Sequence, residues 1–111
     1  MKHHRVVFSE LARRQLDELY DFIAERAHPD IALSFVERIE TFCRGLETFP
    51  ERGSLRNEVR PGLRIVGFRR QASIAFTVTG ATVVILAVFR RGADPEALLA
   101  EGGEFGTADD E

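Results

Sequence analysis

The first half of the chain repeats apolar residues at spacings of three and four positions, which is the period of an amphipathic helix. One run predicts a helix over residues 10–26, with Ser9 as its N-cap and Glu10 in the first turn. A second run predicts a helix over residues 31–47, capped by Asp30. The short turn between them predicts an antiparallel helical hairpin. The apolar stripes are Ala12, Leu16, Leu19, Tyr20, Ile23 and Ala27 on the first helix, and Ala32, Phe35, Val36, Ile39, Phe42, Cys43 and Leu46 on the second.

The second half of the chain alternates apolar residues with small or polar ones, which predicts strands. Residues 63–69 form one such strand and residues 73–79 another. Residues 82–89 are apolar on both faces, as is typical of a central strand. Gly80 and Ala81 predict a two-residue hairpin turn, in which glycine at the first position suits type II′.

Two further segments complete the order of elements. Arg5–Phe8 predicts a short strand, and the polar residues 51–62 predict a loop. The resulting order is β-α-α-β-β-β, so we expect an α+β fold with the helical hairpin packed on one face of a small, mostly antiparallel sheet. No helix remains for the other face, although the central strand is apolar there too. Either loops and large side chains cover that face, or a partner does.

Length and composition predict a single soluble domain. The chain has 111 residues, of which 44% are hydrophobic and 30% charged, and this excludes wholesale disorder. We expect the domain over residues 1–93 and an acidic tail over residues 94–111, with its last part disordered. No apolar stretch is long enough for a membrane helix and no signal peptide precedes the domain, so we expect a cytoplasmic protein. The single Cys43 excludes a disulfide framework, and we expect no metal and no cofactor.

The net charge of −3 conceals an uneven distribution. Seven acids and no base follow from Asp94 to the end, whereas residues 52–91 hold one acid, Glu58. The same segment contains eight arginines: Arg52, Arg56, Arg60, Arg64, Arg69, Arg70, Arg90 and Arg91. These arginines can be ordinary solvated positions, but the cluster as a whole needs a counter-charge, for which the acidic tail and an acidic partner are candidates.

The basic segment offers anion binding without proton transfer. Between residues 52 and 91 there is no His, Tyr, Lys or Cys. Arginine keeps its proton at any working pH, so it clamps phosphate or carboxylate but is a poor base. Glu58 is the only carboxylate there and lies in the predicted loop. Tyr20, the sole tyrosine, belongs to the first helix's apolar stripe. We therefore expect no catalytic residues.

A few residues outside this segment admit two interpretations. Leu11 and Phe22 lie off the main stripe of the first helix, and are either ordinary exposed apolar residues or a patch for a partner helix. His3 and His4 are adjacent, so on a strand they point to opposite faces and cannot chelate a metal together. We interpret both as surface residues.

Several segments, taken in order, resemble the RelE/ParE superfamily of type II toxin–antitoxin toxins. The resemblance covers about residues 5–94 and rests on the ordered set rather than on any single piece. The pieces are Ser9-x-x-Ala12-x-x-x-Leu16, Ala32-x-x-Phe35, Leu46-x-x-Phe49-Pro50-x-x-Gly53, Arg60-Pro61-Gly62-Leu63-Arg64 and Phe89-Arg90-Arg91-Gly92-Ala93-Asp94. The long helical hairpin and the Pro-Gly-x-Arg entry into the sheet favour the ParE branch.

The resemblance implies one of two activities. RelE-like members are ribosome-dependent mRNA endonucleases, whereas ParE-like members poison DNA gyrase. Because the segment lacks an acid/base set, we expect a ParE-like gyrase inhibitor, neutralised by a small acidic ParD-like antitoxin. The alternatives are an mRNA interferase and a non-toxic binding module that retains the toxin fold. The residues expected to bind the target are Arg64, Arg69, Arg70, Arg90 and Arg91, and those expected to bind the antitoxin are Leu11 and Phe22.

Overall fold

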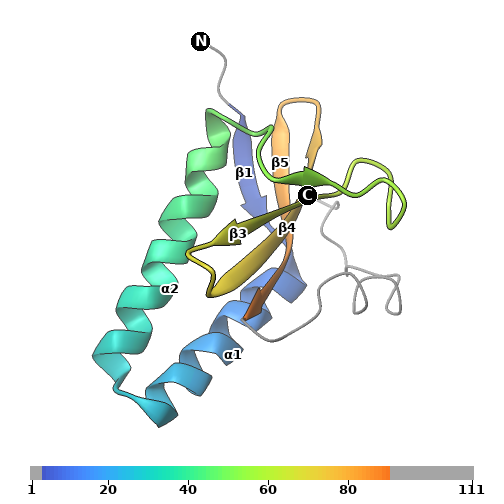
Figure 1. Ribbon diagram of the computed structural model, residues 1–111. Coiled ribbons are helices and arrows are strands. Elements are labelled where there is room, and N and C mark those ends of the chain that lie inside the picture. Colours follow the sequence, from blue (N-terminus) through green and yellow to red (C-terminus); the bar gives the residue numbers. More distant parts are fainter. Residues whose placement is uncertain (1–3, 91–111) are drawn as a thin grey trace.

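The computed structural model describes residues 4–90 and confirms the α+β architecture (Figure 1). The elements are β1 (Arg5–Phe8), α1 (Glu10–Arg26), α2 (Pro29–Arg44), the 3₁₀ turn η1 (Gly45–Glu47), β2 (Ser54–Leu55), β3 (Arg64–Phe68), β4 (Ala72–Thr79) and β5 (Thr82–Arg90). The two helices form the predicted hairpin and cover one face of the sheet. The short strand β2 lies where a loop was predicted, because two residues are too few to show an alternating pattern.

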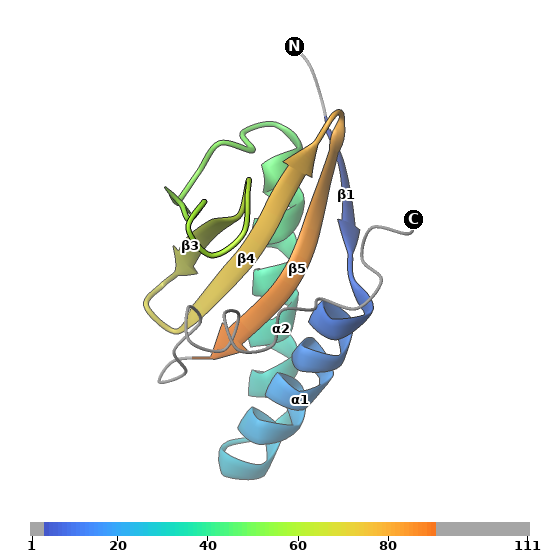
Figure 2. The same cartoon turned by 90° about the vertical axis from the view of Figure 1, so that its right-hand side faces the viewer.

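The five strands follow the order β1-β5-β4-β3-β2. β1 pairs with β5 in parallel, and the other neighbouring strands are antiparallel. β5 is therefore internal over the half that pairs with β1, as its apolar pattern predicts. Figure 2 shows the sheet in front of α2, with β1 along its outer edge. A β-bulge between Ala75 and Phe76 shifts the β4–β5 register.

Each helix begins at a side-chain cap. The Oγ of Ser9 accepts the amide of Ala12 at 2.9 Å and donates to the carbonyl of Leu86 at 2.8 Å, so one buried hydroxyl caps α1 and ties it to β5. The predicted cap of α2 was wrong: His28 is the N-cap, and its Nδ1 accepts the amide of Asp30 at 3.0 Å. Pro29 occupies the first helical position, where its fixed φ suits the helix.

Two apolar cores lie on opposite faces of the sheet. The larger joins the helix hairpin to residues such as Ile74, Phe76, Ile85 and Val88. The second contains Ala75, Val84, Leu86, Ala87 and Phe89, and Leu63 from the segment before β3 is fully buried in it. Val59 and Leu11 also pack against this cluster. Large side chains from a loop and from α1 thus contribute to covering the face that has no helix of its own.

The two hairpin turns differ in their backbone chemistry. Gly80 has φ +60° in the β4–β5 turn, while Ala81 keeps a negative φ, as type II′ requires. In the β3–β4 turn, Arg69 and Arg70 both have positive φ, at 51° and 58°, and the amide of Gln71 donates to the carbonyl of Phe68 at 2.9 Å. That is a type I′ turn, which favours Asn-Gly. A left-handed conformation costs an ordinary residue about 1–2 kcal/mol, so two arginines here are strained.

Candidate functional site

The arginines predicted to bind a target do not form one surface. Arg64 begins β3, whereas Arg69 and Arg70 follow its other end, roughly 13 Å further along the strand. Arg90 pairs with Ala72 at the start of β4, so it lies at the same end of the sheet as Arg69 and Arg70. Arg91 lies outside the described residues. The described arginines therefore divide into Arg64 at one end and Arg69, Arg70 and Arg90 at the other.

Phe22 lies at the Arg90 end of the sheet, between two guanidinium groups. The Cζ of Arg26 is 3.8 Å from the centre of the Phe22 ring, and that of Arg90 is 4.2 Å from it. Both distances are within the range of cation–π attraction. A residue predicted to bind the antitoxin and one predicted to bind the target are thus in direct contact.

The ring of Phe22 also lines an apolar cavity of about 590 Å³, which we call the hairpin-end groove. The groove lies between the connected ends of α1 and α2 and the ends of β4 and β5. Ile31, on its wall, is 56% exposed, which is high for an isoleucine beside other apolar side chains. Its lining residues are Leu19, Phe22, Ile23, Ile31, Phe35, Gln71 and Arg90.

Leu11 does not lie beside this groove. Phe22 lies eleven positions further along the chain, so the two share a side of α1 but are three turns, or roughly 16 Å, apart. Leu11 packs against the second core instead. Between them, Gln15 accepts the amide of Val88 through Oε1 at 2.7 Å, at the edge of β5 that β1 does not reach. Leu11 therefore belongs to the second core, whereas Phe22 belongs to the hairpin-end groove.

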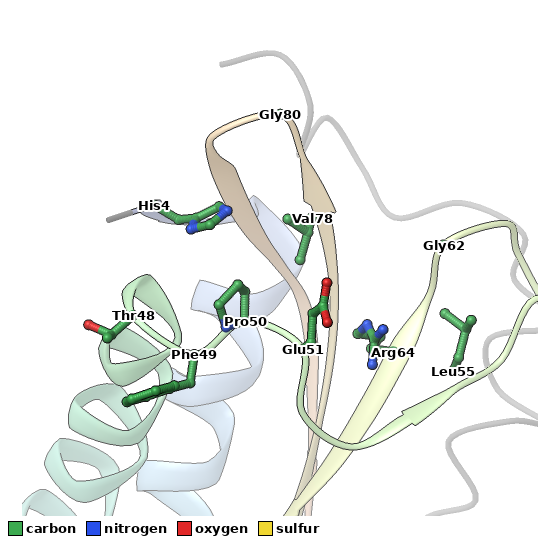
Figure 3. Close-up of a pocket in the computed structure, with 10 residues that line it drawn as sticks. All are labelled: His4, Thr48, Phe49, Pro50, Glu51, Leu55, Gly62, Arg64, Val78 and Gly80. Carbon is green, nitrogen blue, oxygen red and sulfur yellow. The ribbon is translucent and has the colours of Figure 1, made fainter. Parts of the chain in front are cut away.

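Arg64 lines a different pocket, of about 870 Å³, together with Glu51 and with His4, which was interpreted from the sequence as a surface residue (Figure 3). His4 reaches it from the N-terminal side, where its amide donates to the carbonyl of Glu47 at 2.7 Å. The Nδ1 of His4 is buried and has no hydrogen-bond partner within residues 4–90. Glu51 approaches from the segment after η1, and Figure 3 shows its carboxylate on the same side of the pocket as Arg64.

An imidazole, a carboxylate and a guanidinium thus share this second pocket. The sequence did not reveal this set because His4 and Glu51 lie outside the basic segment and about 47 residues apart along the chain. The available signal was the Phe49-Pro50-x-x-Gly53 run, which turns the chain back toward β3. Such a set can bind a phosphate and exchange a proton at the same place.

Other reactive groups are accounted for structurally. Burial, with a smaller contribution from the Glu40 carboxylate, raises the pKa of the Cys43 thiol to about 12, so this cysteine is an inert core residue at neutral pH. Across residues 4–90, no cluster of His, Cys, Asp and Glu side chains has a geometry that suits a metal ion. The helices of that same part of the chain are too short or too polar to cross a bilayer.

Comparison with known proteins gives this fold a family. The family model of the ParE toxin of the type II toxin–antitoxin system parDE matches residues 6–95. A chain of the chromosomal ParDE toxin–antitoxin system from P. aeruginosa superposes with a TM-score of 0.70 and 27% identity, covering 80% of this chain and 97% of that one. A mutant of the E. coli toxin RelE in the free state has the same fold, with a TM-score of 0.62, 15% identity, and coverage of 91% and 97%. No curated protein matches by sequence. The chain belongs to the ParE family of type II toxin–antitoxin toxins.

Proposed function

We propose that this toxin acts in the cytoplasm by binding DNA gyrase and arresting growth, without catalysing a reaction itself. The observation that carries the proposal is the arginine group Arg69, Arg70 and Arg90, which shares one end of the sheet. No residue of the basic segment 52–91 can accept a proton at neutral pH except the loop carboxylate Glu58. This end of the sheet therefore binds an anionic surface and has little means of cleaving one.

The same proposal includes a ParD-like antitoxin that neutralises the toxin by covering the hairpin-end groove. The groove is apolar inside and has Arg26 and Arg90 at Phe22. An amphipathic helix with acidic residues beside its apolar anchors fits both features. Because Arg90 contacts Phe22, a bound antitoxin also covers part of the arginine group. Neutralisation then follows from direct competition between antitoxin and target.

Purified toxin is expected to reduce the supercoiling activity of gyrase, or to trap its cleaved-DNA complex, and to leave mRNA on translating ribosomes intact. The gyrase assay and the mRNA assay use the same preparation of toxin, and each is run with and without the cognate antitoxin. Codon-dependent cleavage of mRNA would contradict the proposal. Failure in both assays, together with the absence of growth arrest on induction, supports the non-toxic binding module instead.

An mRNA interferase remains the second candidate function because of the pocket that contains His4, Glu51 and Arg64. The imidazole can accept a proton there, and the guanidinium can hold a phosphate. If this pocket carries the toxicity, His4→Ala abolishes growth arrest. Under the gyrase proposal, His4→Ala leaves growth arrest unchanged, since the pocket lies at the opposite end of β3 from the arginine group.

Charge reversal at the two ends of the sheet separates these candidates. We expect Arg90→Glu to restore growth and to raise the toxin concentration needed for half-inhibition of gyrase about tenfold or more, because a reversed charge repels an anionic surface. Arg64→Glu serves as the matched control, with the same change of charge on the same sheet. Relief of growth arrest by Arg64→Glu alone would assign the toxicity to the pocket.

A further inference from the structure

A second groove, of about 500 Å³, lies between α2 and the β3–β4 turn. Its wall on the helix side includes Ser34, Arg38 and Thr41, and its wall on the sheet side includes Phe68 and Arg69. Figure 1 shows this turn next to α2. We call it the arginine groove. Its lining residues are Ser34, Glu37, Arg38, Thr41, Phe42, Phe68 and Arg69.

Two aromatic rings hold guanidinium groups at this groove. The Cζ of Arg69 is 5.5 Å from the centre of the Phe68 ring, and the Cζ of Arg52 is 5.0 Å from that of Phe42. The two rings are themselves 5.3 Å apart. The two rings and the two guanidiniums therefore belong to one cluster of neighbouring side chains. Each ring orients its arginine, which lowers the entropy lost when that arginine binds a ligand.

Positive charge exceeds negative charge on the described lining of the arginine groove. Within residues 4–90, none of Arg38, Arg52 and Arg69 forms an ion pair with a carboxylate. Glu37 is the one acid on the groove's described lining, against Arg38 and Arg69 on the same lining and Arg52 above Phe42. Guanidiniums gathered at one groove, without an ion pair in the described part of the chain, attract a ligand with several negative charges.

The backbone of the turn supplies a second, independent observation. Arg69 and Arg70 occupy positions where Asn and Gly form the turn without strain. Strain in ordinary residues concentrates at sites that bind or react. Of the two strained residues, Arg69 lines the groove, and Arg70 follows it directly in the turn. Asn-Gly would form this turn with less backbone strain. The arginines that stand there instead add positive charge at the groove.

We propose that the arginine groove binds the phosphate backbone of nucleic acid without reading its bases. Guanidinium forks match phosphate oxygens, and the hydroxyls of Ser34 and Thr41 are further donors for them. The rings of Phe42 and Phe68 are occupied by arginines, so they are not free to stack on bases. This property is independent of the target proposed above: a protein that fails to inhibit gyrase can still bind nucleic acid, and the converse also holds.

The test measures fluorescence anisotropy of a labelled 20-base-pair DNA duplex with the full-length protein between 50 and 200 mM salt. A single-stranded RNA of the same length and a polyglutamate peptide are the comparison probes. The variant is Arg69→Asn with Arg70→Gly. Its matched control is Arg13→Gln with Arg44→Gln, which also removes two arginines; these two lie over the ring of Phe8, at 5.4 and 5.3 Å.

We expect the turn variant to bind the duplex about tenfold more weakly or worse, and its slope of log affinity against log salt to fall by about 2. The control is expected to keep most of the affinity. The turn variant should also melt several degrees higher, because its backbone strain is gone, so a folding defect cannot explain its loss of binding. Single-stranded RNA bound with the same dependence on the turn also supports backbone recognition. Equal weakening in variant and control, or binding of polyglutamate in preference to both nucleic acids, would overturn the proposal.

Discussion

Phe22→Asp is expected to abolish neutralisation by the antitoxin while the toxin remains folded and active. The ring lies between the guanidiniums of Arg26 and Arg90 and forms part of the wall of the hairpin-end groove. An aspartate there removes the apolar anchor and repels an acidic partner. Loss of a central aromatic anchor costs about 2–4 kcal/mol of binding free energy. That corresponds to about 30- to 1000-fold in Kd.

Calorimetric titration of the variant with its antitoxin measures this loss, and coexpression shows whether growth arrest returns. Leu33→Asp is the matched control, because Leu33 is also apolar and 50% exposed on the hairpin but does not line the groove. The fold should tolerate both changes, since neither side chain is buried in a core. Equal affinity of the two variants for the antitoxin would show that the partner binds elsewhere.

Gly53→Ala is expected to destabilise the fold by on the order of 3–4 kcal/mol, a large part of the stability of a small domain. Gly53 has φ +77°, which favours glycine over every other residue. A Cβ at this position would also overlap the backbone oxygen of Ile65 and lie 2.8 Å from its carbonyl carbon. The chain has no room for a methyl group where the segment before β2 crosses β3.

Gly62→Ala separates the two causes of this loss. Gly62 has a nearly identical φ of +79°, but a Cβ there would meet nothing within 4 Å. We expect that variant to lose about 1 kcal/mol, from the backbone conformation alone. Urea denaturation of both variants gives the difference, which measures the overlap with β3. Equal losses would mean that β3 moves away from residue 53 without cost.

The elements of this fold were predictable where a pattern extends over several turns or residues. The stripe from Ala12 to Ala27 and the alternation in β4 each repeat often enough to define a period. Short features were not predictable in this way. β2 has only two residues. The cap of α2 depends on which side chain, that of His28 or that of Asp30, accepts a backbone amide of the first turn. Local propensity favours Asp as a cap, so it is the arrangement of the turn that selects His28.

The candidate sites were predictable as residue types but not as groups. Composition alone indicated an anion-binding surface without a base in residues 52–91. Which arginines share a surface depends on the register of β3, β4 and β5, which places Arg90 opposite Ala72 and leaves Arg64 at the far end. Leu11 and Phe22 are equivalent on a helical projection, yet one enters a core and the other a groove.

By itself, the sequence determined the class of fold, because hydrophobic periodicity and glycine or proline positions act through local backbone geometry. The family followed from the resemblance of its ordered motifs, which the family model then confirmed. Only the tertiary structure decided the sites. It placed Phe22 against Arg90, His4 and Arg64 on the lining of one pocket, and Arg52 and Arg69 on two neighbouring rings, three associations between residues at least 17 positions apart. Contacts of that kind depend on strand register and helix packing, which many distant residues fix together and no local pattern encodes.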